Sequence, residues 1–519
     1  MCLRLLSSAS SQNMESKNKD KILYGLIPCS IQIMICCAFG FTLFGYDQVL
    51  YSGIIINEYF LSAFNHPSTD LLGQISATFD LGSLLGCILT CFIGERLGRR
   101  KTIITGCCIN VVGGILQATP HTVAQLIVGR LVAGLGNGLI TSTLPVWQAE
   151  TCGALFRGQM LVAQLGIVGL GAVLCSWLNF GMRFVQSSFS WRFPIALQCL
   201  FAVLCAAMCL YLPESPRWLI SRRCVEEGEY VISLLLRKPV ECDEVQDMKN
   251  DVVCNVEHES EVAGQTGWRD LFRRDETQNL RRIILGALSQ FFQQMGGINV
   301  VNYYMGYIVQ NYAGFSQSQS LILQAGNLMN QTFFTFVAVS FIERAGRKKS
   351  LFWGYIAMGI AFTMETIGLG IGTKQSRLVA VAFMFVYITA FGLSNNAIPW
   401  LYPAEINSQQ YRFMGAAIST GTNWLFNYVV VVITPTAIAN IGWRYYIIYA
   451  VVNFVAAVVV HFFFVETAGK SLEQIDAWFM DDYRNRKGLE PAEAHYGLSM
   501  HINQGKDKTS TSIHSIVSV

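Results

Sequence analysis

The chain alternates long apolar runs with short polar turns along most of its length. A helix that spans the hydrocarbon core of a bilayer needs about 20 mostly apolar residues. Twelve runs meet this requirement, six before and six after a polar stretch near the middle of the chain. They fall at 27–56, 72–94, 102–119, 122–142, 159–182, 193–212, 283–310, 321–342, 350–372, 378–402, 413–437 and 443–464. The pattern predicts an all-α membrane protein with twelve transmembrane helices.

Short polar motifs recur at matching places in the two sets of runs. The turn at 95–101 reads ERLGRRK, and the turn at 343–349 reads ERAGRKK. In the same order, a Trp-Arg pair at 191–192 returns at 443–444, and Glu214 has a counterpart in Glu466. Several motifs that recur in order indicate an internal duplication. We therefore predict two pseudo-symmetric six-helix bundles.

Polar segments divide the chain around these bundles. The segment at 215–282 is too polar to span a membrane, and it includes stretches suited to short surface helices. The tail beyond the last run is charged and then rich in Ser and Thr. The predicted parts are an N-terminal tail at 1–25, a first bundle at 26–214, a linker at 215–282, a second bundle at 283–465 and a C-terminal tail at 466–519.

Basic residues predict the orientation of the chain. Lys and Arg are dense in the two repeated turns and in the linker, whereas the turns at 57–71 and 312–320 contain neither. Cytoplasmic loops of membrane proteins carry an excess of Lys and Arg. We expect the repeated turns, the linker and both termini to face the cytoplasm, in a multi-pass protein of the plasma membrane.

Composition narrows the classes of function. The chain is 52% hydrophobic and 14% charged, against about 25% charged residues in a typical soluble domain. A net charge of +3 without a basic, aromatic-rich region argues against a nucleic-acid partner. Most of the cysteines sit inside apolar runs, where Cys acts as a small hydrophobe, and they lack zinc-type spacing. We expect no metal, no cofactor and no enzymatic activity.

Asp47 is the charged group best suited to chemistry inside a span. A charge at mid-bilayer costs about 2.5–3.5 kcal/mol on insertion scales, so it usually faces a cavity or a partner. Arg130, in the fourth run, is available as that partner. A movable pair of this kind could bind and release a proton, and a fixed structural ion pair is the alternative. Asp80 and Glu365 also fall inside runs, and we expect them to be structural or cavity-facing.

A second group of candidates consists of neutral polar side chains within the runs. The Gly296-Gly297 pair in the seventh run can interrupt a helix and expose backbone groups. Amides offer both donors and acceptors, which match the hydroxyls of a neutral sugar or polyol. Hydrogen bonds between helices are the alternative role. The candidates are Gln164, Gln293, Gln294, Asn299 and Asn423, with Trp400 as an apolar plane for a sugar ring.

The repeated turns supply a third group of candidates. In each half a Glu is followed two helical turns later by an Arg, at the predicted cytoplasmic end of the fifth span of that half. Single surface ion pairs contribute about 0–1 kcal/mol, but networks can be stronger. We predict a cytoplasmic gate in which such pairs lock the two halves together. Its members are Glu95, Arg96, Arg99, Glu150, Arg157, Glu343, Arg344, Arg347, Glu405 and Arg412.

Ten motifs in order resemble the sugar porter family of the major facilitator superfamily, and within it the fungal-type, often proton-coupled members. The resemblance extends from about residue 39 to residue 476. The motifs are FGYDQ at 44–48, GERLGRR at 94–100, GR at 129–130, PVWQAE at 145–150, PESPRW at 213–218, QQMGGIN at 293–299, ERAGR at 343–347, WLYPAEI at 400–406, NW at 423–424 and ETAGKSLE at 466–473.

The resemblance implies roles for individual residues. It matches Asp47 and Arg130 to the proton-coupling pair of the family. It matches the five amides and Trp400 named above to sugar contacts, and in the eighth span it leaves Asn330 and Gln331 as alternatives for a further one. The tenth span departs from the family, since Asn396 and Ala397 replace a usual Gly-Pro element. Asn396 is therefore an additional candidate for substrate contact.

The expected function is import of a sugar, most simply a monosaccharide, by proton symport through alternating access. The partners implied are a small neutral sugar or polyol, protons and the lipid bilayer, with the protein active as a monomer. A facilitative sugar or polyol uniporter is one alternative, in which Asp47 is only structural. A sugar sensor that does not transport is another.

Overall fold

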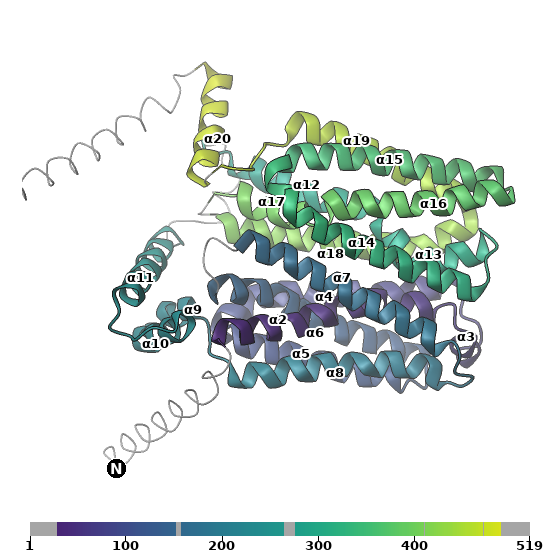
Figure 1. Ribbon diagram of the computed structural model, residues 1–519, viewed down its shortest axis with the longest axis horizontal. Helices are drawn as coiled ribbons and strands as arrows, with labels where there is room; N and C mark the ends of the chain where they lie inside the picture. The colour runs from purple at the N-terminus through teal and green to yellow at the C-terminus, as the bar shows by residue number, and fades with distance from the viewer. Residues whose placement is uncertain (1–27, 152–156, 264–275, 409–410, 471, 489–519) are drawn as a thin grey trace, which may run out of the picture.

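The computed structural model describes residues 28–151, 157–263, 276–408, 411–470 and 472–488. Long helices lie roughly side by side in two groups, one from each half of the chain (Figure 1). Helices α9 (Pro216–Ser221), α10 (Val225–Leu236), α11 (Asp243–Ala263) and α20 (Leu472–Lys487) lie together at one end, which we call the linker end. The short helix α3 (Glu58–Ala63) lies at the other, which we call the α3 end.

The first half contains six long helices. They are α2 (Cys29–Ile54), α4 (Thr69–Leu97), α5 (Arg99–Ala118), α6 (Val123–Thr151), α7 (Arg157–Met182) and α8 (Phe189–Tyr211). Side-chain caps fix two starts near the α3 end, where Asn57 accepts from the N–H of Tyr59 and Ser68 accepts from the N–H of Leu71. These caps satisfy backbone donors that a helix N-terminus leaves without partners.

The second half repeats the pattern with two interrupted spans. Its helices are α12 (Asn279–Met295), α13 (Ile298–Asn311), α14 (Gln317–Ala345), α15 (Arg347–Ile371), α16 (Lys374–Ala390), a π-turn (Phe391–Asn395), α17 (Ile398–Ile406), α18 (Arg412–Ile441), a 3₁₀ turn (Gly442–Arg444) and α19 (Tyr445–Phe463). The interruptions fall between α12 and α13 and between α16 and α17.

Within the described residues, nine segments are long and apolar enough to cross a membrane on their own. The segment Met414–Phe463 holds two of the predicted spans, α18 and α19. The pair α12–α13 is broken into two short helices, and Asn and Gln side chains lower the mean hydropathy of α14. These three features account for the difference from twelve. The all-α, twelve-helix architecture is confirmed.

The two interruptions have different causes. Gly297 adopts a φ of 97° between α12 and α13, a conformation that glycine tolerates without strain. The π-turn ends where the N–H of Asn396 donates to the carbonyl of Phe391 at 2.9 Å. Pro399 follows in the first turn of α17 and has no N–H to offer. The tenth span is thus interrupted although Asn396 and Ala397 stand where the resemblance implies a Gly-Pro element.

Small residues bring helices into close contact within the first half. A Cβ added at Gly82 of α4 would lie 2.3 Å from the carbonyl oxygen of Leu131. One added at Gly134 of α6 would lie 2.1 Å from the carbonyl oxygen of Phe79. No side chain fits either place, so the backbones of α4 and α6 touch. Membrane helices pack closely through small residues in this way.

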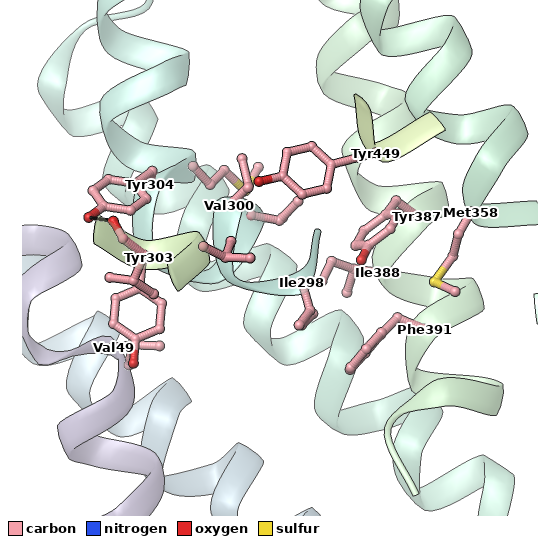
Figure 2. Packing of buried hydrophobic residues seen from close by; sticks show 14 of the residues in the cluster. Val49, Ile298, Val300, Tyr303, Tyr304, Met358, Tyr387, Ile388, Phe391 and Tyr449 are labelled. Atoms are coloured by element: carbon pink, nitrogen blue, oxygen red, sulfur yellow. Dashed lines mark hydrogen bonds between the residues drawn. The ribbon is translucent and has the colours of Figure 1, made fainter. Parts of the chain in front are cut away.

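The halves meet along α2, α4 and α7 on one side and α13, α14 and α18 on the other. One buried hydrophobic cluster extends across this boundary. Figure 2 shows part of it, with Val49 of α2 beside Tyr303 of α13 and a group around Tyr387 and Tyr449 farther into the second half. The boundary between the halves is therefore a packed interface, and the polar residues within it stand out.

Candidate functional site

A cavity of about 110 Å³ lies between the halves. Residues of α2 and α7 line one side, and residues of α12, α13, α14, α17, α18 and the π-turn line the other. Every side chain in its lining is uncharged. The polar members are Gln48, Gln293, Gln294, Asn299, Asn302, Gln331, Thr332, Thr335, Asn396, Asn423 and Asn427, and the aromatic ones are Phe44, Phe391, Trp400 and Trp424.

Most of the amides predicted to contact substrate lie in this lining and bond to one another. Gln293 donates to the carbonyl of Asn395 at 2.7 Å and accepts from Asn423 at 2.9 Å. Asn299 donates to the carbonyl oxygen of the Gln294 side chain. Asn396, at the position of the missing Gly-Pro element, donates to Thr335 at 2.7 Å. These bonds hold the amides in place at the wall of the cavity.

Two aromatic residues supply apolar surface beside the amides. Trp400 lies in the wall at the first turn of α17. Trp424 contacts Phe44 of the opposite half edge-to-face, with ring centroids 5.8 Å apart. An aromatic plane beside hydrogen-bonding groups offers both an apolar and a polar contact to one ligand.

Two predicted residues do not line the cavity. Asn330 donates to the carbonyl of Phe385 at 3.1 Å and to the hydroxyl of Thr389 at 2.9 Å, so it ties α14 to α16. Its neighbour Gln331 lies in the cavity wall instead. The amide of Gln164 bonds to Gln148. Of the two alternatives for the eighth span, the structure places Gln331 in the cavity wall and Asn330 outside it, because adjacent residues on a helix face different directions.

The cavity wall also contains polar residues that the sequence analysis did not select. Asn427 follows Asn423 by one helical turn, and Asn302 follows Asn299 by one turn. Gln48 is the residue next to Asp47. Residues one turn apart share a helix face, so helical spacing from the selected amides would have identified Asn427 and Asn302.

Asp47 and Arg130 are both fully buried, but they do not form the predicted ion pair. One carboxylate oxygen of Asp47 accepts from the amide of Asn110 at 3.3 Å, and the other has no hydrogen-bond partner. Arg130 donates to the carbonyls of Ile75 and Ser76 at 3.2 and 2.8 Å. The amide of Asn110 also donates to the carbonyl of Ala133, one turn along α6 from Arg130, so the two groups are neighbours within the same half.

Aromatic rings hold the guanidinium of Arg130 in place. It lies 4.3 Å from the ring centroid of Tyr51 and 4.6 Å from that of Phe79. Cation–π contacts of this kind are stronger away from water. One terminal nitrogen, Nη1, has no hydrogen-bond partner. The arginine therefore keeps a donor available for a carboxylate.

The repeated turn of the first half forms a compact charged cluster at the linker end. Arg99 donates to both carboxylate oxygens of Glu150, at 3.0 and 2.9 Å, and pairs with Glu95 at 3.1 Å. Glu214 accepts from the backbone N–H groups of Arg99 and Arg100. Burial raises the pKa of Glu214, although these N–H groups partly offset it.

The second half builds the same cluster. Arg347 donates to both oxygens of Glu405, at 3.2 and 2.7 Å, and its backbone N–H donates to Glu466 at 2.7 Å. Gly346, with a φ of 84°, lets the chain pass against Glu466, as Gly98 at 87° does beside Glu214. The duplicated sequence motif is thus a duplicated structure.

These clusters correct the predicted gate. Each arginine pairs with a glutamate of its own half, so the described ion pairs brace each half internally and do not join the halves. Arg96 and Arg344 are exposed, and Arg412 is half-buried. The side chains of Arg157 and Glu343 lie outside the described residues. A repeated motif cannot tell by itself whether its copies pair within halves or between them.

The described hydrogen bonds between the halves lie elsewhere. At the α3 end, Gln317 donates to the carbonyl of Ile56 at 2.7 Å, and Thr436 bonds to Asp70. Near the cavity, the hydroxyl of Tyr303 lies 2.7 Å from Gln48. The halves are therefore tied at the α3 end and at the level of the cavity.

Comparison with known proteins agrees with this architecture. The family profile described as "Sugar (and other) transporter" matches residues 33–479. The chain belongs to the sugar porter family of the major facilitator superfamily. This sugar porter is 35% identical to the "Sugar transporter STL1" of Saccharomyces cerevisiae, over 88% of its own length and 82% of the relative. It is 37% identical to the "MFS-type transporter oryC" of Aspergillus oryzae, over 86% and 85% of the two chains.

Solved structures agree with the same assignment. The proton:xylose symporter XylE, bound to 6-bromo-6-deoxy-D-glucose, superposes with a TM-score of 0.73 at 25% identity, over 87% of this sugar porter and 99% of XylE. The members of the family named here are transporters and not enzymes. The protein is therefore a multi-pass membrane transporter.

Proposed function

We propose that this sugar porter imports a neutral monosaccharide or polyol by proton symport through alternating access. The observation that carries the proposal is a cavity between the halves, walled by neutral amides and tryptophans, close to a buried carboxylate and guanidinium. The cavity is suited to a hydroxylated ligand, and the charged pair is suited to a proton. Their closeness provides a physical basis for coupling the two.

The chemistry of the wall favours an uncharged substrate. A charged ligand in a buried site needs an opposite charge to offset its desolvation, and the cavity lining holds none. Amides can both donate to and accept from hydroxyl groups. Trp400 and Trp424 offer faces for the apolar side of a sugar ring.

Asp47 and Arg130 are the proposed proton-coupling pair. A buried, ionised carboxylate without a close counter-ion is costly, so protonation favours the separated arrangement. Direct pairing with Arg130 favours the ionised form. A conformational change that brings the two groups together would therefore release the proton.

The contacts between the halves suggest the direction of access. The halves are tied at the α3 end, and the described ion pairs at the linker end stay within each half. We propose that this conformation opens toward the cytoplasm, with the linker end and both termini on that side. We also propose that the protein lies in the plasma membrane and is active as a monomer.

The names of the relatives support the proposed substrate class and the proposed coupling to protons. XylE is a proton:xylose symporter, and a relative from Candida albicans, 30% identical over 83% of this chain, is a high-affinity glucose transporter.

Uptake measurements test the proposal. Cells that lack their own hexose carriers would express the protein and be offered radiolabelled glucose, xylose and glycerol, with and without a protonophore. We expect concentrative uptake of at least one compound, abolished by the protonophore. Equilibrating uptake that resists the protonophore would instead indicate a uniporter. Surface-expressed protein that takes up none of a wider sugar and polyol panel would point to a sensor.

A further inference from the structure

A second buried carboxylate lies on the path between Arg130 and the cavity. Asp80 of α4 is fully buried and lies one turn after Ser76, whose carbonyl accepts from Arg130 at 2.8 Å. One carboxylate oxygen of Asp80 lies 3.3 Å from the hydroxyl of Tyr303, and the other has no hydrogen-bond partner. Tyr303 in turn lies 2.7 Å from the side-chain oxygen of Gln48, which lines the cavity.

We propose that Asp80 is a second proton-binding site, linked to the substrate cavity through Tyr303 and Gln48. The proposal deepens the symport described above and rests on it for the link to substrate, whereas proton binding at Asp80 stands on the local geometry. The chain of contacts crosses from the first half to the second and back, so it also lies where the halves must move.

Charge balance provides the first argument. Two carboxylates, Asp47 and Asp80, share one cation, Arg130, in a fully buried region. Neither lies within ion-pair distance of the guanidinium among the described contacts. If both were ionised, the group would carry a net negative charge without solvent, which is strongly unfavourable. At least one carboxyl in this conformation is therefore protonated.

The geometry of the hydrogen bonds provides the second argument. A tyrosine hydroxyl has one hydrogen, so it donates to one neighbour at a time. The shorter contact of Tyr303 is to the carbonyl oxygen of Gln48, which can only accept. When Tyr303 donates there, its oxygen can take part in the 3.3 Å contact with Asp80 only as an acceptor, and only a protonated carboxyl can donate to it. The arrangement therefore favours a proton on Asp80.

Deprotonation of Asp80 would change which group the hydroxyl of Tyr303 donates to. An ionised Asp80 only accepts, so the hydroxyl of Tyr303 would turn to it and release Gln48. The freed oxygen of Gln48 could then accept from a ligand hydroxyl in the cavity. The protonation state of Asp80 would in this way change what the cavity wall offers to substrate.

The surroundings of Asp80 are well defined. Arg130 on α6 and Tyr303 and Tyr304 on α13 are the titratable groups that interact with it, and the side chain of Gln48 on α2 is a further polar neighbour. Tyr304 donates to the carbonyl of Val431 at 2.9 Å. Arg130 and Tyr303 thus remain as the groups through which Asp80 senses its environment.

Infrared difference spectroscopy tests the proposal directly. The full-length protein in liposomes would be compared between acidic and alkaline buffers, and the carbonyl stretch of protonated carboxyls would be identified by its shift in D₂O. We expect separate components from the two carboxyls, one lost in Asp47→Asn and the other in Asp80→Asn. Glu365→Gln is the matched control, because Glu365 is a buried acid of α15 outside the cavity wall. It should leave both components unchanged. A spectrum of Asp80→Asn identical to that of the wild type would overturn the proposal.

A second variant guards against a folding defect in Asp80→Asn. Tyr303→Phe keeps Asp80 but removes its hydrogen-bond partner, so the Asp80 component should remain and shift in frequency. An unshifted component would contradict the chain to Gln48. The outcome is separable from that of the uptake assay. Loss of the component with uptake that ignores a protonophore would support the proton site and reject symport. Proton-coupled uptake with no Asp80 component would support symport and reject the proton site at Asp80.

Discussion

The two halves of this transporter share a fold and a repeated turn, yet they place different chemistry at the level of the cavity. The first half contributes the buried charges, Asp47, Asp80 and Arg130. The second half contributes nearly all the amides of the cavity wall. Its own buried acid, Glu365, sits in α15 with no hydrogen-bond partner and outside that wall. Duplication preserved the scaffold, and the interior then diverged.

This division suggests how coupling can work. In the proposed function, most polar ligand contacts and the proton chemistry lie in different halves, so each can be tuned with little effect on the other. They communicate where the halves touch, through Tyr303, Gln48 and the packed residues around Val49 (Figure 2). If the division is real, variants in the two halves should have different kinetic signatures.

The largest expected effect is on accumulation. Asp47→Asn should lower the steady-state accumulation of a transported sugar by at least about tenfold, which corresponds to only about 1.4 kcal/mol of lost driving force. The asparagine cannot exchange a proton, so net uptake should stop at equilibration while exchange of sugar across the membrane persists. Radiolabel accumulation and counterflow in the same vesicles measure both. Glu365→Gln is the control. Full accumulation by Asp47→Asn would contradict the assignment of proton chemistry to the first half.

The next effect compares the two copies of the repeated turn. Arg99→Ala should destabilise the protein by about 2–3 kcal/mol, since hydrogen bonds to charged groups contribute about 1.5–3 kcal/mol and a buried glutamate loses its partner. Arg347→Ala should cost less. The side chain of Glu405 is 24% exposed against 9% for Glu150, and the hydroxyl of Thr467 still donates to it.

Thermal unfolding of the detergent-solubilised variants measures this difference. Arg96→Ala is a matched control, because Arg96 occupies the same turn and is exposed. Equal losses in the two arginine variants would show that exposure of the partner does not matter here. A large shift in access to the linker end without a loss of stability would revive the idea of a lock between the halves.

Sequence patterns predicted the scaffold more reliably than the directions of side chains. The twelve spans, the duplication and the cluster of Gln293, Gln294 and Asn299 follow from local hydrophobicity and motifs. The choice between Asn330 and Gln331 depends on the rotation of α14 about its axis. That rotation is set by packing against α7 and α16, which involves residues far away in the sequence. The pairing of Arg99 and Arg347 within their own halves depends on tertiary contacts for the same reason.

That choice gives a matched pair of variants in the second half. Gln331→Ala should raise the KM for sugar by about 2- to 10-fold, the equivalent of one lost hydrogen bond to substrate. The pH dependence of uptake should stay unchanged, because the proposed proton-coupling groups lie in the other half. Asn330→Ala should leave KM close to the wild-type value and affect stability instead. Initial-rate uptake over a range of sugar concentrations separates the two. Equal changes in KM would mean that α14 rotates during transport.

The smallest effect concerns the contacts that join the halves. Gln317→Ala removes the hydrogen bond to the carbonyl of Ile56 at the α3 end, and a single hydrogen bond contributes about 0.5–1.5 kcal/mol. The population open at the α3 end should therefore rise by about 2- to 10-fold. Labelling of a cysteine introduced at Asn302, which lines the cavity, by an impermeant maleimide reports this change. Ser318→Ala, at the next position on α14, is the control. The contact stabilises one conformation and involves neither the proposed proton-binding groups nor the cavity. The variant should therefore change KM and the pH profile only as far as it changes the population open at the α3 end. A change in pH profile beyond this would mean that proton coupling reaches the α3 end and is not confined to the first half.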